Sequence, residues 1–125
     1  MYLIDTNIFL EILLDQEKQE KCKKFLTKNA DSLSISDFTL HSIGVILLRQ
    51  NKSEIYLRFA DDILPQVTIL SLPKSNYRDI VSASKSLRLD FDDAYQYLVA
   101  KANDLTIVTL DSDFKKVKET KVKFL

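Results

Sequence analysis

The regular alternation of short β-type runs with stretches long enough for helices constrains the fold most strongly. Strand character appears in five short runs, at residues 2–4, 33–36, 67–70, 106–109 and 122–125. Two of these runs contain adjacent apolar residues, Leu3-Ile4 and Ile107-Val108, as expected of strands that are covered on both faces. The pattern predicts an α/β fold, a three-layer α/β/α sandwich around a mainly parallel central sheet.

The intervening stretches have helical periodicity. Ile55, Phe59 and Ile63 recur on one face of a helix predicted over 53–64. Pro73 opens a second helix that runs to Leu87. The period predicts further helices over 6–14, 38–48 and 91–102. With 125 residues and no linker or repeat, we expect a single domain over 1–125.

Scarce residue types exclude several classes of site. The chain has one Gly, one Cys and one His among its 125 residues. One Gly excludes the phosphate-binding and dinucleotide-binding glycine loops, and one Cys excludes disulfides and Cys-rich zinc sites. The longest apolar stretch, residues 43–48, is far shorter than the roughly 20 residues that span a bilayer. An acidic residue as early as Asp5 leaves no secretory segment, and we therefore expect a cytoplasmic protein without membrane contact.

Carboxylates follow three of the predicted strands. Asp5 follows the first, Asp37 the second, and Asp111 with Asp113 the fourth. Asp93 lies in the first turn of the helix predicted over 91–102. Each has an ordinary alternative explanation, since helices favour acidic residues as N-caps and in their first turn. Because parallel strands place their carboxyl ends at one edge of the sheet, we expect several of these carboxylates to converge there.

Converging carboxylates favour a bound cation. Two unit charges 4 Å apart repel by about 4 kcal/mol at an effective dielectric constant near 20. Oxygen donors without His or Cys select hard ions, which predicts Mg²⁺ or Mn²⁺. Such an ion activates water and offsets charge on a phosphodiester undergoing hydrolysis.

Three segments together resemble the PIN domain, and by size the VapC-like toxin ribonucleases. They are Ile4-Asp5-Thr6-Asn7-Ile8, the helix start Asp93-Ala94 with Ala100 and Ala102, and the run from Ile107 to Phe114. The resemblance implies a Mg²⁺- or Mn²⁺-dependent endoribonuclease that is the toxin of a toxin-antitoxin pair. Asp5, Asp93 and Asp111 match the family's metal ligands, and Asp113 completes the catalytic set of four.

The sequence departs from the family at its second acidic position. The family pattern Ser-x-x-Thr-x-x-Glu begins at Ser36 and Thr39 but places Ser42 where the Glu belongs. Ser42 is a weak, uncharged ligand. Asp37 is a possible substitute, and His41 is a possible phosphate or proton contact, although a lone helical His is more often simply packed or solvated.

This departure keeps a second function open, that of a catalytically degenerate PIN-like domain that binds RNA or protein. Two other Mg²⁺-dependent classes fit less well. A receiver domain needs an acidic pair after the first strand and an Asp after the third, where Ser71 stands. A haloacid-dehalogenase-type phosphatase needs Asp-x-Asp where this chain has Asp5-Thr6-Asn7.

Charge is unevenly distributed although the net charge is zero. Residues 17–28 hold five Lys and two Glu, a net +3, and residues 114–125 hold five Lys and one Glu, a net +4. An acidic centre flanked by basic surfaces is compatible with an RNA substrate, although solvated lysine-rich faces explain the runs equally simply. The apolar surplus of residues 43–48 favours a homodimer or an antitoxin groove, beside the alternative of a central core helix.

Overall fold

A five-stranded, fully parallel sheet forms the centre of the molecule. The computed structural model describes all residues, 1–125. The strands are β1 (Tyr2–Ile4), β2 (Leu33–Ser36), β3 (Thr68–Leu70), β4 (Thr106–Thr109) and β5 (Val122–Phe124), in the spatial order β3-β2-β1-β4-β5. β1 is central and pairs in parallel with both β2 and β4. The carboxyl ends of β1 and β4 therefore lie side by side.

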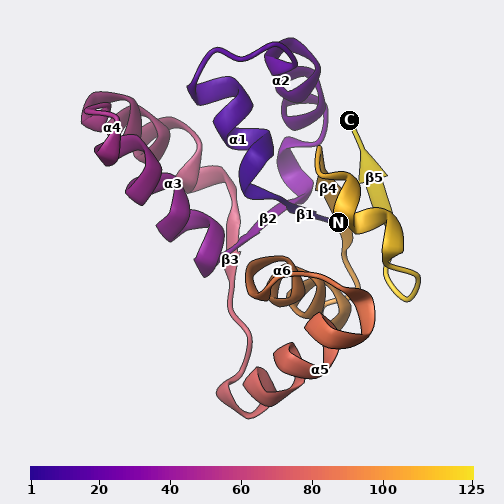
Figure 1. Ribbon diagram of the computed structural model, residues 1–125. Helices are drawn as coiled ribbons and strands as arrows, with labels where there is room; N and C mark the ends of the chain where they lie inside the picture. Colours follow the sequence, from indigo (N-terminus) through magenta and orange to yellow (C-terminus); the bar gives the residue numbers. More distant parts are fainter.

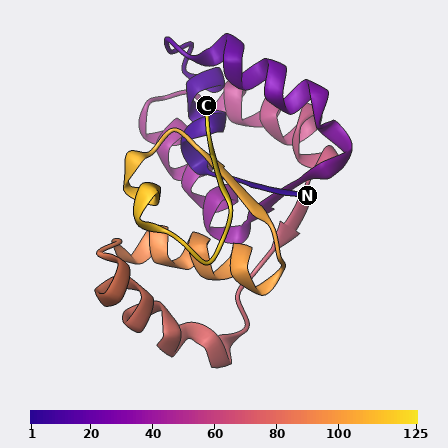
Figure 2. The ribbon, with the colours of Figure 1, turned by 90° about the vertical axis from the view of Figure 1, so that its right-hand side faces the viewer.

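Six α-helices cover the two faces of the sheet (Figure 1). They are α1 (Thr6–Leu13), α2 (Gln19–Lys28), α3 (Asp37–Arg49), α4 (Ser53–Asp62), α5 (Tyr77–Leu87) and α6 (Phe91–Ala102). The first four lie on one face, and α5 with α6 lie on the other, a separation that is also visible after a quarter turn (Figure 2). This is the three-layer α/β/α arrangement that the alternating pattern predicts.

Each face of the sheet has its own apolar core. Leu3 and Ile107 point into the core beneath α5 and α6, whereas their neighbours Ile4 and Val108 point into the core beneath α1–α4. All four side chains are fully buried. Adjacent apolar residues in one strand therefore serve opposite cores, which is why doubly covered strands lack polar alternation.

The predicted elements form, with differences at their ends. The helix predicted over 38–48 begins at Asp37, because Ser36 is its N-cap and accepts a hydrogen bond from the Thr39 amide at 3.0 Å. The stretch after Pro73 first forms a 3₁₀ turn (Lys74–Asn76), and only then does α5 begin. The lysine-rich stretch forms α2, which the periodicity did not define. None of the helices combines the length and the apolar character needed to cross a lipid bilayer.

Candidate metal centre

Asp5 is fixed at the carboxyl end of β1 by four hydrogen bonds. It caps α1, where its Oδ1 accepts from the Thr6 amide at 2.9 Å. The Thr109 hydroxyl at the end of β4 donates to Oδ2 at 2.7 Å, and Asn7 Nδ2 donates to the same oxygen at 3.2 Å. Gln96 Nε2 donates to Oδ1 at 3.2 Å. These bonds fix the orientation of the Asp5 carboxylate, and the residue is only 6% exposed.

Three other carboxylates converge beside it. One oxygen from each of Asp93, Asp111 and Asp113 lies within 4.8 Å of the other two. Asp93 comes from the first turn of α6, where Asp90 is the N-cap. Asp111 follows β4 and caps the 3₁₀ helix η4 (Ser112–Lys116), which carries Asp113. Asp93 and Asp111 are half-buried and Asp113 is exposed, so the cluster opens to solvent.

Burial and mutual repulsion disfavour the ionised forms. The pKa of Asp93 is raised to about 7, first by burial and then by the charges of neighbouring aspartates, including Asp5, Asp111 and Asp113. The pKa of Asp5 is also raised, mainly by burial, although its hydrogen bonds from Thr109, Gln96 and Thr6 counteract this. A cation would relieve the same repulsion.

Gln96 is a site residue that our sequence analysis missed. Its Nε2 donates to Thr39 Oγ1 at 2.8 Å as well as to Asp5, and so it connects α6 to α3 and β1. The side chain is 1% exposed, and its Oε1 has no hydrogen-bond partner. A signal was present in the sequence, because Gln96 is a polar residue one turn after Asp93 on an otherwise apolar inward face of a helix.

The structure places Asp37 and His41 apart from the three-carboxylate cluster. Asp37 Oδ1 accepts a hydrogen bond from the Tyr95 hydroxyl at 2.6 Å. Asp37 and His41 are both exposed and line a shallow depression with Tyr77, Phe91 and other residues. Ser42 is half-buried and follows Thr39 by one helical turn on the inward side of α3.

The donor set fits a hard divalent cation. Mg²⁺ takes oxygen ligands at about 2.0–2.1 Å, so two ligands of one ion lie up to about 4.2 Å apart. The three carboxylate oxygens, all within 4.8 Å of one another, are close to that spacing. No Cys or His joins them, which fits Mg²⁺ or Mn²⁺ better than a softer metal.

These observations define a parallel α/β protein with a carboxylate cluster at the carboxyl edge of its sheet. The PIN domain family matches residues 2–120. The chain belongs to the PIN domain family, as the resemblance in three short segments predicted. No curated protein matches the chain.

Solved structures with the same fold cover almost the whole chain. A toxin-antitoxin complex from Klebsiella pneumoniae gives a TM-score of 0.79 at 19% identity and covers 98% of this chain and 96% of its own. FitAcB from Neisseria gonorrhoeae gives a TM-score of 0.78 at 24% identity, and the match covers 100% of this chain and 97% of the FitAcB chain. VapBC2 from Rickettsia felis, bound to a DNA fragment from its promoter, gives a TM-score of 0.76 at 18% identity. The match covers 98% of this chain and 97% of the other. At these identities the likeness establishes the fold.

Proposed function

We propose that this protein is a Mg²⁺- or Mn²⁺-dependent endoribonuclease, the toxin of a toxin-antitoxin pair. The convergence of Asp93, Asp111 and Asp113 in a PIN-family fold carries the proposal. Structural neighbours that are toxin-antitoxin proteins support the toxin role and an antitoxin partner. RNA as substrate, a cytoplasmic location and a homodimeric state complete the proposal.

The proposed ligands of the ion are Asp93, Asp111 and Asp113, with Asp5 as a fixed, buried carboxylate behind them. When bound, a divalent ion lowers the pKa of water and neutralises charge on the phosphodiester. Asp5 is kept in place by the cap of α1 and the Thr109 hydroxyl, and Asp111 by the cap of η4. We assign to Asp113, the most exposed of them, the additional role of accepting a proton from the attacking water.

Replacing Asp93 tests the proposal most directly. Asp93→Asn keeps the size of the side chain but removes one charged oxygen ligand. We expect Mn²⁺-dependent cleavage of a mixed RNA substrate to fall by at least about 100-fold, because even residues around metal ligands commonly contribute 10–100-fold. Asp92→Asn is the matched control, since Asp92 is the exposed neighbour on the same helix and is outside the cluster. Equal activity of the two variants would contradict the assignment.

A second candidate function is a binding module that has lost catalysis, and Ser42 at the family's second acidic position favours it. The two functions differ in their demand for metal. A nuclease binds Mn²⁺ through Asp93, and calorimetric titration should show heat that Asp93→Asn abolishes. A binding module needs no such heat and should bind RNA equally well in EDTA and in Mn²⁺ without cleaving it.

A further inference from the structure

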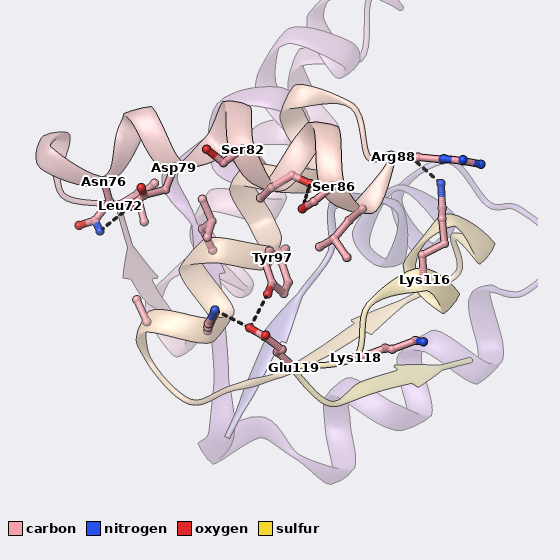
Figure 3. Close-up of a pocket in the computed structure, with 15 residues that line it drawn as sticks. Leu72, Asn76, Asp79, Ser82, Ser86, Arg88, Tyr97, Lys116, Lys118 and Glu119 are labelled. Atoms are coloured by element: carbon pink, nitrogen blue, oxygen red, sulfur yellow. Dashed lines mark hydrogen bonds and ion pairs between the residues drawn. The ribbon is translucent and has the colours of Figure 1, made fainter.

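A large cavity of the molecule lies outside the carboxylate cluster. It has a volume of about 1040 Å³ and is bounded by α5, α6 and the segment from η4 to β5 (Figure 3). The small side chains of Ser82, Ala83 and Ser86 line it from α5. Tyr97 lines it from α6. The volume is at the upper end of the range of about 300–1,000 Å³ that small-molecule sites occupy.

One side of this cavity carries cations that have no acidic partner. Arg88, Lys116 and Lys118 gather there (Figure 3), and none of them forms an ion pair. Lys116 Nζ instead donates to the carbonyl oxygen of Arg88 at 2.6 Å, which links η4 to the turn between α5 and α6. Asp79 of α5 also lines the cavity, where it accepts a hydrogen bond from Asn76. Three cations without an ion-pair partner outnumber this one carboxylate and favour an anionic ligand.

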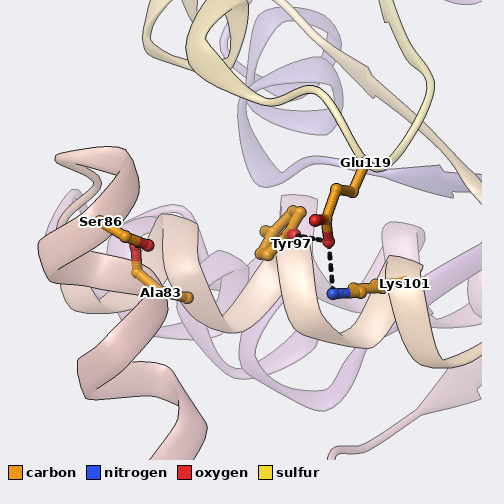
Figure 4. Close-up of polar contacts among 5 residues, drawn as sticks. All are labelled: Ala83, Ser86, Tyr97, Lys101 and Glu119. Atoms are coloured by element: carbon orange, nitrogen blue, oxygen red, sulfur yellow. Dashed lines mark hydrogen bonds and ion pairs between the residues drawn. The ribbon is translucent and has the colours of Figure 1, made fainter.

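A charged contact holds the segment between η4 and β5 against α6. Glu119 accepts from Lys101 Nζ at 2.6 Å and from the Tyr97 hydroxyl at 3.3 Å, so the segment before β5 is attached to α6 (Figure 4). This contact neutralises Lys101 and Glu119. The remaining charges of the lining are the three cations Arg88, Lys116 and Lys118 against the single carboxylate of Asp79, so the cavity keeps an excess of positive charge.

The cavity adjoins the carboxylate cluster along two elements. Tyr97 follows Asp93 by one turn of α6, a rise of about 6 Å. Lys116 follows Asp113 by one turn of η4, also about 6 Å. A strand with one phosphate at the cluster therefore has its neighbouring nucleotide close to the rim of the cavity.

We propose that this cavity binds the nucleotide next to the cleaved phosphate in single-stranded RNA, with Arg88, Lys116 and Lys118 contacting the backbone. The inference rests on the proposed nuclease function. A base enters a concave site only when it is unpaired, and single-stranded regions are where proteins read RNA bases. The hydroxyls of Ser82 and Ser86 offer hydrogen bonds to the edge of the base.

The charge contribution is tested by fluorescence anisotropy with a labelled single-stranded RNA 12-mer in EDTA, where no cleavage occurs. The variant Arg88→Gln/Lys116→Gln/Lys118→Gln removes three cations. We expect its Kd to rise at least tenfold at 0.1 M salt and the slope of log K against log salt to fall by about 2, at roughly 0.7 per contact. The control Lys21→Gln/Lys24→Gln/Lys28→Gln removes three charges from α2. Equal weakening by both variants would overturn the inference.

The cavity itself is tested without changing charge. Ser86→Leu places a larger side chain in the cavity from an exposed position of α5. We expect weaker binding of the single strand with an unchanged salt slope, while Ser75→Leu, outside the cavity, binds as wild type. Binding of Ser86→Leu at wild-type strength would overturn base insertion, and so would equal affinity for a fully paired RNA duplex.

Three further results separate this inference from the alternatives. Displacement of the RNA by an equally charged poly-glutamate peptide at equal concentration would show that the cavity recognises charge alone, and would overturn the assignment to RNA. Cavity-dependent RNA binding without Mn²⁺-dependent cleavage would reject the nuclease and retain the RNA site. Cleavage with unaltered binding by the charge and cavity variants would retain the nuclease and reject the RNA site.

Discussion

The aspartates at the carboxyl edge of the sheet differ in their surroundings: some carboxylates accept hydrogen bonds, and others face only like charges. Asp5 is nearly buried, yet it accepts four hydrogen bonds. The Asp93 carboxylate accepts no hydrogen bond, and burial, followed by repulsion from the surrounding aspartates, raises its pKa to about 7. A carboxyl group whose folded-state pKa is raised above the unfolded value favours the folded state when it is protonated.

Stability in the absence of metal should therefore depend on Asp93 and pH. In wild type, stability decreases as the pH rises from about 4, where Asp93 is neutral in the folded state, through about 7, where it ionises. Asp93→Asn removes this penalty. We expect the variant in EDTA to be more stable by about 1 kcal/mol at pH 8, a modest value because solvent screens a half-buried charge. The advantage should vanish at pH 4.

Thermal unfolding measures this difference, which corresponds to about 4 °C in Tm for a chain of this size. Asp61→Asn, an exposed position on α4, is the control and should show no such pH-dependent difference. A Tm difference between Asp93→Asn and wild type that is the same at pH 4 and pH 8 would show that the ionisation of Asp93 does not destabilise the fold.

Ser42→Glu restores a carboxylate at the position where the family has one. Ser42 lies one turn after Thr39, whose hydroxyl contacts Gln96 beside Asp5. Since ligand charge tunes the metal affinity of oxygen sites, we expect the Kd for Mn²⁺ to fall by on the order of tenfold. Asp37→Asn should leave the Kd unchanged, because that carboxylate is engaged by Tyr95 and is not in the cluster. Calorimetric titration with Mn²⁺ measures the Kd of both variants. A higher Kd in Asp37→Asn than in wild type would mean that Asp37 contributes to metal binding.

At the scale of single elements, the sequence predicts the strands well and the helix α2 less well. The apolar pairs Leu3-Ile4 and Ile107-Val108 indicate doubly covered strands without any tertiary information. The stretch that becomes α2 has a lysine-rich surface, and only Cys22 and Leu26 are buried in it, so its apolar period is weak. Gln96 was missed for a different reason: its role depends on contacts with Asp5 and Thr39, which are distant in the sequence.

The turn between α5 and α6 contains a strained residue. Arg88 is the C-cap of α5 and has φ 54° and ψ 42°, the left-handed region that favours glycine. Arg88→Gly should therefore stabilise the protein by about 0.5–1 kcal/mol, whereas Lys85→Gly in the last turn of the same helix should destabilise it by about as much. Thermal unfolding of the two variants measures both effects. If Arg88→Gly lowers Tm, side-chain contacts of Arg88 outweigh the backbone strain.

At the scale of the whole molecule, the acidic cluster and the cations beside it are built from residues near opposite ends of the chain. Asp5 lies in the first segment, and the carboxylates Asp111 and Asp113 precede the basic tail that lines the large cavity. The pairing of β1 with β4 brings these ends together. The sequence already places Lys116 and Lys118 just after Asp113, but only the pairing of β1 with β4 brings Asp5 to the same site.

The proposed homodimer has a candidate surface on the side of the molecule where α3, α5 and α6 meet. Tyr77 and Phe91 are 44% and 55% exposed, and both line the depression that includes His41. His41 also lines an adjoining groove that ends at Leu48, which is 55% exposed. Large apolar side chains gathered in this way on a monomer favour burial against a partner.

Replacing Phe91 with Asp tests this surface, because a charge buried in an apolar interface has no partner to compensate its desolvation. We expect wild type to sediment as a dimer at tens of micromolar and Phe91→Asp to sediment as a monomer, with dimer affinity reduced at least 100-fold, or about 2.7 kcal/mol. Leu57→Asp is the matched control, since Leu57 is 60% exposed on α4 and lines neither depression, so this variant should remain dimeric. A wild-type monomer would reject the dimer itself, whereas loss of the dimer in Leu57→Asp alone would move the interface to α4.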